Sequence, residues 1–474
     1  MRRIISLYLP LLLFFSVLFP TAAGTAQNTA SSGPIYIVQE GDSLWDIAYR
    51  FHVSQTELAG MNGISDANQI SIGQALVIPG LEGITGILTT QNVPYGETLK
   101  SLGLRYQISD QALKRLNHIT SPNELYMGYS LVIPQQDTPA DLGKRVSIRS
   151  GESVFEMAIL NQANPWSILS MNQQAGSSGL LPGMALRAPG KDNGGAGALP
   201  PEIDTVEIAG LTQGETAEIQ VGGQANLTLS GRWMDHTLNF SPAEQTGYFA
   251  LQGVHAMAKP GLYPLSIQGS SADGAAINFS QMVMVKAGDF VYDRSLPVDP
   301  ATLDPETNRV ENELWVDSSS PVSPEKMWDG KMFLPVEPVF AECYSSRFGS
   351  RRSYNGGEYL YFHTGLDFCG QVGDPIYAAA AGKVVLVDSL TIRGKATMID
   401  HGQGVYTAYM HQSEILVNDG DHVEQGQLIG RVGNTGRVEG PHLHFEVIVG
   451  GIQVDPLVWL SQEFPISLEN HSGP

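Results

Sequence analysis

Five side chains in the last third of the chain have the types and spacing of a metal centre with acid–base groups beside it. His363 and Asp367 lie four residues apart, His442 and His444 lie two apart, and His411 lies between these pairs. Side chains on a strand alternate between its two faces, so the members of each pair point the same way on a strand. The flanking glycines and aromatic residues favour loop and strand over helix.

Imidazole and carboxylate groups in this pattern indicate a zinc site. Three protein ligands of the His/His/Asp kind leave the fourth zinc position for water, which is typical of a catalytic site. Zinc lowers the pKa of that water toward about 7 and polarises a carbonyl oxygen. Since five groups exceed three ligands, two histidines remain for proton transfer and oxyanion stabilisation. The residue types alone leave open which three bind the metal.

The flanks of these residues extend the pattern over residues 340–459. The motifs, in order, are Ser346-Arg347-Phe348-Gly349-Ser350-Arg351, His363-Thr364-Gly365-Leu366-Asp367-Phe368, Gly373-Asp374-Pro375-Ile376-Tyr377-Ala378, Ile399-Asp400-His401-Gly402, Gly426-Gln427-Leu428-Ile429-Gly430, Gly433-Asn434-Thr435-Gly436 and Gly440-Pro441-His442-Leu443-His444-Phe445-Glu446. In this order they resemble the lysostaphin/LytM-type zinc endopeptidases of bacterial cell walls. The resemblance implies that His363, Asp367 and His444 bind Zn²⁺ and that His411 and His442 are the catalytic pair.

Other residues near these motifs have simpler interpretations. We expect His401 to be a turn residue bonded to backbone and His422 to be exposed. Tyr409 shares strand parity with His411, so it lines the groove or packs in the core. We expect the groove walls in residues 351–361 and 391–395.

The length and charge of the whole chain limit its architecture and partners. At 474 residues it is too long for one core, so we expect several domains. Its formal charge of -21 argues against binding to nucleic acid or anionic membranes, because both need basic surfaces. Uncharged glycans and peptides remain as partners.

Residues 1–26 have the pattern of a signal peptide. A positive start at Arg2-Arg3 precedes an apolar run over residues 4–19, and small residues up to Ala26 follow. The apolar run is short for a membrane span. We therefore expect an exported protein, extracellular, associated with the cell wall or periplasmic, with no transmembrane segment in its mature form.

The two cysteines of the chain, Cys343 and Cys369, both lie in the peptidase-like segment. In an exported protein an even pair predicts a disulfide. A loop of this length would add about 3–4 kcal/mol of stability on the chain-entropy estimate. The rival role, zinc ligation, is disfavoured by the complete His/Asp set.

The N-terminal part contains a repeat with a step of 55 residues. The recurring positions are Gly41, Gly96 and Gly151; Asn62, Asn117 and Asn172; Gly73, Gly128 and Gly183; and Pro79, Pro134 and Pro189. Each copy predicts a strand, two short helices and a strand. The copies resemble LysM modules, which bind N-acetylglucosamine-containing glycans such as peptidoglycan or chitin.

The resemblance places the sugar site between two turns of each module. In the first copy these turns are Gly41-Asp42-Ser43 and Gly73-Gln74. We expect glycan binding by the first two copies but not by the third, degenerate copy. The alternative for all three copies is a role as packing spacers. Several weak sites on one chain would raise avidity.

The remaining segments complete a multidomain, mostly β architecture. We expect three βααβ modules, a β-sandwich that is immunoglobulin-like, and a C-terminal antiparallel β peptidase domain of the duplicated hybrid motif type. The expected boundaries are a signal peptide at 1–26, LysM modules at 34–80, 90–135 and 144–190, a flexible linker at 191–201, the sandwich at 202–290, an extended acidic connector at 291–338, the peptidase at 339–462 and a tail at 463–474.

These features predict an exported zinc endopeptidase that hydrolyses the peptide cross-links of peptidoglycan, with glycan and stem peptides as its partners. Two alternatives remain from other functional classes. One is a non-enzymatic wall-binding activator of a separate amidase, and the other is a glycan-binding adhesin.

Overall fold

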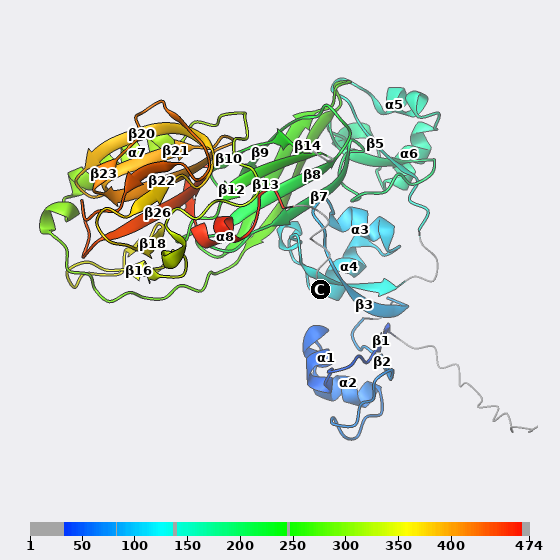
Figure 1. Cartoon of the computed structure of the whole chain (residues 1–474). Helices are drawn as coiled ribbons and strands as arrows, with labels where there is room; N and C mark the ends of the chain where they lie inside the picture. Colours follow the sequence, from blue (N-terminus) through cyan, green and yellow to red (C-terminus); the bar gives the residue numbers. More distant parts are fainter. Residues whose placement is uncertain (1–32, 82, 136–139, 244–246, 467–474) are drawn as a thin grey trace, which may run out of the picture. The chain divides into compact units, whose positions relative to one another are not determined.

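The computed structural model describes residues 33–81, 83–135, 140–243 and 247–466 (Figure 1). The chain divides into two compact units, Met1–Thr85 and Gly86–Pro474, and each is described by itself. The predicted signal peptide and most of the predicted tail lie outside the described residues. Among the described residues, no helix combines the length and apolar character needed to cross a bilayer.

The first unit has the order strand, helix, helix, strand. Its elements are β1 (Ile35–Ile37), α1 (Leu44–Arg50), α2 (Gln55–Met61) and β2 (Ala75–Val77), with β1 and β2 antiparallel. Ser43 and Ser54 begin the two helices with capping boxes. Helix α1 buries the apolar face that its sequence predicts, at Leu44, Ile47 and Ala48.

The same order recurs twice in the second unit. The elements are β3 (Ile87–Asn92), α3 (Leu99–Arg105), α4 (Asp110–Asn117) and β4 (Ser130–Gln135), then β5 (Lys144–Ser147), α5 (Val154–Leu160), α6 (Pro165–Met171) and β6 (Ala185–Ala188). The repeated asparagines share one structural role, since Asn62, Asn117 and Asn172 each bond to the backbone of the second helix and of the returning strand. This shared bond explains why asparagine recurs at the 55-residue step.

Residues 203–285 form two four-stranded antiparallel sheets. One has the order β10 (His236–Asn239), β9 (Thr228–Trp233), β13 (Gly261–Ser270), β14 (Ala276–Val285), and the other β11 (Ser241–Pro242), β12 (Tyr248–Gly253), β8 (Thr216–Gly223), β7 (Ile203–Ala209). Apolar residues of both sheets, including Trp233 and Ile219, share one core. The sheets therefore pack face to face, as a sandwich does.

The flexible linker expected at residues 191–201 is packed instead. Leu199 lies in the sandwich core. The buried guanidinium of Arg145 donates to the backbone carbonyls of Leu199 and Ile203 at 3.2 and 2.9 Å. A Cβ on Gly195 would lie 2.5 Å from the Arg145 guanidinium, and one on Gly197 would lie 2.6 Å from the Ser101 side chain, so these glycines permit close packing.

The C-terminal domain is built on a large antiparallel sheet. Its strands follow the order β15 (Tyr344–Ser346), β18 (Leu366–Cys369), β26 (His442–Val449), β22 (Val405–Gln412), β21 (Gly394–Asp400), β20 (Gly382–Leu390), β24 (His422–Val423), and β27 (Ile452–Val454) pairs with β26. A smaller sheet contains β19 (Pro375–Tyr377), β25 (Leu428–Arg431) and β23 (Glu414–Ile415), β16 (Arg351–Arg352) pairs with β17 (Tyr361–Phe362), and α8 (Pro456–Ser461) follows.

Strand β26 divides its side chains between two environments. Leu443, Phe445 and Val447 enter the main apolar core. Ile448, on the opposite face, joins a second apolar cluster that also contains Trp315. The alternating sequence therefore leaves its histidines on the face that the second cluster shares.

The connector contains a helix that the sequence reading did not predict. Helix α7 (Pro305–Ser319) begins with Asp304 as N-cap, which accepts a hydrogen bond from the Thr307 amide at 2.8 Å. Asp followed by Pro at the first helical position is a helix-start signal. Three residues expected to anchor the connector, Trp315, Trp328 and Met332, are buried.

The sandwich packs directly against the C-terminal domain. The Trp459 indole donates to Thr216 Oγ1 at 2.9 Å, and the Asp455 amide donates to the Gly214 carbonyl at 2.8 Å. Phe249 of β12 lies in the main core of the C-terminal domain.

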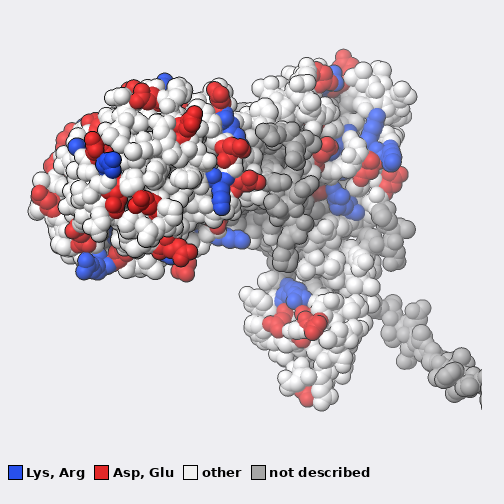
Figure 2. Space-filling model, viewed as in Figure 1, with Lys and Arg blue, Asp and Glu red and all other residues white. Residues whose placement is uncertain are grey.

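On the face shown in Figure 2, Lys and Arg lie singly or in small groups among Asp and Glu.

The disulfide between Cys343 and Cys369 is present, and it spans 26 residues. We expect replacement of both cysteines by serine to lower the free energy of unfolding by about 3–4 kcal/mol, because the open chain gains conformational entropy when unfolded. Denaturant unfolding of the variant and of the oxidised chain measures this difference. A reduced but otherwise unaltered chain is the control, and equal stability of all three would contradict the expectation.

Candidate metal centre and active site

Two paired strands place the predicted metal ligands. Asp367 of β18 lies directly opposite His444 of β26 in the sheet register. Side chains opposite each other in an antiparallel pair share a face and lie close together. His363, which precedes β18, completes the group. His444 Nδ1 lies 2.7 Å from Asp367 Oδ1, and His363 Nε2 lies 2.9 Å from the same oxygen.

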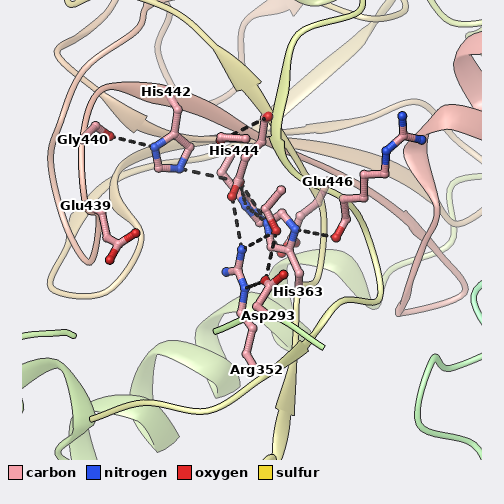
Figure 3. Close-up of polar contacts among 12 residues, drawn as sticks. Asp293, Arg352, His363, Glu439, Gly440, His442, His444 and Glu446 are labelled. Atoms are coloured by element: carbon pink, nitrogen blue, oxygen red, sulfur yellow. Dashed lines mark hydrogen bonds and ion pairs between the residues drawn. The ribbon is translucent and has the colours of Figure 1, made fainter. Parts of the chain in front are cut away.

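These three side chains are buried, and one donor atom of each lies within 4.8 Å of the others. The second nitrogen of each imidazole is engaged elsewhere: His363 Nδ1 bonds to the Arg347 carbonyl at 2.9 Å, and His444 Nε2 contacts Glu446 Oε1 at 3.2 Å (Figure 3). Such bonds fix the tautomers that turn His363 Nε2 and His444 Nδ1 toward a metal ion. The donor set fits a three-ligand site.

The carboxylate of Asp367 has a cationic partner on its other side. Arg352 Nη2 donates to Asp367 Oδ2 at 3.2 Å, and Arg352 Nε donates to Asp293 Oδ2 at 3.3 Å (Figure 3). Arg352 thus holds one oxygen of Asp367 while Oδ1 faces the two imidazoles. The sequence did not predict this role: Arg352 directly follows the Ser346–Arg351 motif, but its partner Asp293 lies in the connector, and no local pattern joins the two.

A second chain of contacts reaches His444 from the connector. The buried Glu446 contacts His444 Nε2, and the Trp315 indole of α7 donates to Glu446 Oε2 at 3.0 Å. The Arg393 guanidinium lies 4.5 Å from the Trp315 ring centre and pairs with Glu311 of α7 at 3.4 Å. Helix α7 therefore supports the metal ligand through Glu446.

His411 reaches the site through an irregularity in β22. Between the pairs Thr397↔Tyr409 and Lys395↔Gln412, strand β22 contains one more residue than β21. His411 lies in this bulge with φ of 61°. A bulge re-aims a side chain, so His411 and Tyr409 separate although their parity is the same. The His411 ring lies 4.9 Å from that of His442, whereas Tyr409 is buried in the core.

The two remaining histidines have defined hydrogen-bonding states. His411 Nδ1 lies 2.8 Å from the Thr435 carbonyl, and His442 Nδ1 lies 2.8 Å from the Gly440 carbonyl. Since a carbonyl oxygen only accepts, each Nδ1 carries a proton, and in the neutral form of either ring the lone pair is on Nε2. His442 Nε2 lies 3.6 Å from Asp367 Oδ1.

Burial and neighbouring charges set the protonation of the metal-binding group. Burial lowers the pKa of His363 to about 4. Burial opposes ionisation of Asp367, but His363 and His444 outweigh it and hold the pKa of that carboxyl well below its usual value. Burial also acts against protonation of His444, yet hydrogen bonds to Asp367 and Glu446 raise its pKa to about 9. A metal ion at His444 Nδ1 must therefore displace a proton.

An open groove of about 850 Å³ contains the site. Its lining includes Arg352, Tyr361 and Arg393, in the two segments predicted as groove walls. The connector contributes Asp293, Leu296, Val298, Asn308 and Asn312, and the sandwich contributes His255 and Met257. The groove lining thus includes three parts of the chain, and the sequence predicted walls in only one of them.

Burial of the His411 ring, and the neighbouring His442 and His444, hold the pKa of His411 well below its usual value. This ring is therefore neutral at pH 7, with a lone pair that can accept a proton.

The two other histidines of this domain that the sequence analysis considered lie outside the site, as expected. His401 is buried and bonds to the Ala381 carbonyl at 2.8 Å, and His422 is exposed.

The tentative glycan residues of the first module divide into two kinds. Asp42 accepts from Tyr36 and the Gln39 amide and pairs with Arg50, and Ser43 caps α1. These two side chains hold the module together. Gly41 and Gly73 have φ of 83° and 81° and shape the two turns. The Gln74 side chain accepts from the Ser71 amide.

Comparison with known sequences identifies two kinds of domain. The model of Peptidase family M23 matches residues 361–456, and the LysM domain model matches residues 36–79 and 93–134. The chain thus carries an M23 peptidase domain and two LysM domains. All five predicted metal and catalytic residues lie within the M23 match.

Individual relatives align over the same C-terminal region. Peptidoglycan DD-endopeptidase ShyA of Vibrio cholerae is 42% identical over 113 residues, which are 24% of this chain and 26% of that protein. DD-carboxypeptidase/endopeptidase Mpg of Neisseria meningitidis is 38% identical over 137 residues, 27% of this chain and 31% of that protein. The chain thus spans about a quarter to a third of the length of these curated relatives.

Among solved structures, the antimicrobial peptidase lysostaphin from Staphylococcus simulans is 30% identical, with 24% of this chain and 47% of that chain covered and a TM-score of 0.21.

We expect Asp367→Ala to abolish metal binding, because it removes the oxygen that both imidazoles contact. Metal analysis of the purified chain after dialysis measures the loss. The matched control is His442→Ala, which lies on the same strand face as His444 but outside the three-donor group. Full metal content in Asp367→Ala, or its loss in the control, would contradict the ligand assignment.

We expect Trp315→Phe to weaken metal binding about tenfold, because Glu446 loses the indole donor that orients it toward His444. Competition with a chelator measures the affinity. Trp328→Phe is the matched control: its indole, in the same connector, donates to the Phe464 carbonyl, away from the site. Each variant loses one buried hydrogen bond, so the free energy of unfolding should fall by about 1–3 kcal/mol in both. If the two variants also weakened metal binding equally, Trp315 would have no special role in supporting the metal site.

Proposed function

We propose that this chain is a zinc-dependent endopeptidase that hydrolyses peptide cross-links of bacterial peptidoglycan and is held on the wall by LysM modules. One observation carries the proposal. Three buried donor atoms lie within 4.8 Å of one another, and two further imidazoles, His411 and His442, face them across the same groove. The M23 match over this region supports the same activity.

Zinc is the metal that this donor set supports, with His363, Asp367 and His444 as ligands. When bound, zinc supplies Lewis acidity, which acidifies water and polarises the scissile carbonyl. The protein contributes the fixed orientation of the ligands. Arg352 holds Asp367, and Glu446 holds His444.

The catalytic work of the chain falls to His411 and His442. Each ring keeps its Nδ1 proton on a backbone carbonyl, so Nε2 is the atom that accepts the proton of the attacking water. The ring that accepts it becomes a cation, which stabilises the oxyanion and returns the proton to the leaving amine. The two ring centres lie 4.9 Å apart, which supports a role for both groups at one carbonyl.

The substrate bond that we propose joins D-amino acids of two stem peptides, because the relatives ShyA and Mpg are named for DD-peptidase activity. We place the protein in the cell wall or periplasm, since its N-terminal residues have a signal-peptide pattern and disulfides form in oxidising compartments.

The direct test is mass spectrometry of fragments released by the full chain from defined, cross-linked muropeptides. We expect dimers to become monomers in the presence of zinc, with no release when a chelator is present. Cleavage between sugar and peptide would instead indicate an amidase. Absence of cleavage with stimulation of an added amidase would favour the non-enzymatic activator.

We expect His411→Ala and His442→Ala each to keep the metal ion but lose turnover by at least about a hundredfold, because each removes a group that moves a proton. Initial rates on the same muropeptide dimers measure the loss. His422→Ala, an exposed histidine of the same domain, is the control. Unchanged rates in both site variants would reject the assignment of this pair.

A further inference from the structure

We propose that the first LysM module is the glycan-binding module of this chain, and that the second and third have the corresponding turns built into the scaffold of the sandwich. This inference rests on the proposed glycan-binding role of LysM modules. It changes the expected behaviour of the chain, because three repeats then provide one sugar site instead of several.

In the second module, Gly96 corresponds to Gly41, and other parts of the chain cover the turn that contains it. The Gly96 amide donates to the Gln281 side chain at 2.8 Å, and its carbonyl accepts from the Ala198 amide at 2.9 Å. A Cβ on Gly96 would lie 2.4 Å from the Leu199 side chain. Backbone groups that a sugar would use are therefore already bonded, and no space remains above them.

The second turn of this module is joined to the same sheet. The Met127 amide donates to the Met282 carbonyl at 3.0 Å, and Met127 forms a parallel bridge with Val283 of β14. The buried Tyr95 hydroxyl donates to the Leu265 carbonyl of β13 at 2.8 Å. Both turns that would flank a sugar thus lie against β13, β14 and the 191–201 segment.

The third module is attached through the same side. Gly183, which corresponds to Gly73, lies against β14, where a Cβ would approach the Ala276 carbonyl oxygen to 3.1 Å. Beside its first turn, Arg149 forms an ion pair with Asp273 of the sandwich. The repeat surface that meets the sandwich is therefore the same in both modules.

The first module differs at its turns. A Cβ on Gly41 or Gly73 would meet no described atom of its own unit within 4 Å, so neither turn is covered within that unit. Among the corresponding glycines of the other modules, Gly128 and Gly151 also meet nothing, whereas Gly96 and Gly183 are approached closely, so each of those modules has one glycine turn covered. Directly after the first turn, helix α1 presents Trp45 and Tyr49, which are 59% and 70% exposed and stack with ring centres 5.4 Å apart. The C–H face of a pyranose ring is apolar, and exposed aromatic rings are a suitable surface for it.

The other modules lack this pair at the equivalent positions. The second module has Lys100 and Leu104 there, and the third has Phe155 and Ile159. The stacked aromatic pair and the two open turns therefore occur in the same module. We assign an N-acetylglucosamine-containing glycan as the occupant of this surface.

A single site has a measurable consequence. Linked sites raise the avidity for a long glycan by about 10²–10⁴-fold, and one site gives no such gain. Titration calorimetry of the full chain with a soluble N-acetylglucosamine oligomer should yield one site per chain. We expect Trp45→Ala to weaken binding about tenfold, and Phe155→Ala, the exposed aromatic residue at the equivalent position of the third module, to leave it unchanged.

Hydrogen exchange locates the site independently. Addition of the oligomer should slow amide exchange in residues 40–49 and 72–75 but not in residues 95–98 or 126–129. Gln281→Ala should speed exchange of the Gly96 amide without changing the affinity for the oligomer. Two or more sites, or protection of the second module by glycan, would overturn the inference.

An absence of any glycan binding would also overturn it, together with the wall-targeting part of the proposed function. Cleavage of soluble muropeptide dimers would then still test the peptidase separately.

Discussion

The register between β18 and β26 is the constraint on which the metal centre depends. It sets Asp367 opposite His444 and therefore on the same face of the sheet. A slip of one residue would turn His442 and His444 into the apolar core and bring Leu443 and Phe445 to the groove. The buried Leu443, Phe445 and Val447 make such a slip costly. The hydrophobic core thus fixes the position of the ligands.

Burying this many ionisable groups requires partners in a second layer. Asp367 and Glu446 are both buried, and an unpaired buried carboxylate is strongly unfavourable. Arg352 balances the first. The Trp315 indole donates to Glu446, and although burial raises the pKa of Glu446, His444 and the nearby charge of Arg393 outweigh this effect and lower it. These partners come from segments far apart in the sequence. The metal centre is therefore a property of the assembled second unit.

The sequence predicted those features that local spacing encodes. Strand parity brings His442 and His444 to one face, and motifs that contain glycine frame His363, Asp367, His442 and His444, but not His411. Parity failed at His411, because a bulge with positive φ is not encoded by alternation. Partners such as Trp315 depend on tertiary packing and have no local signal. Helix α7 did have one, the helix-start signal Asp304-Pro305.

The connector and sandwich belong to the same packed unit as the candidate site. The core beneath the large sheet includes Phe249 from the sandwich and Trp328 from the connector. Both segments also line the groove, through Met257 and Leu296. Without them, apolar core surface would be exposed and Glu446 would lose its indole donor. The same sandwich bonds to the second module, through Met127 on β14 and Tyr95 on β13, so the residues that surround the groove and those that hold this module share one β-sandwich.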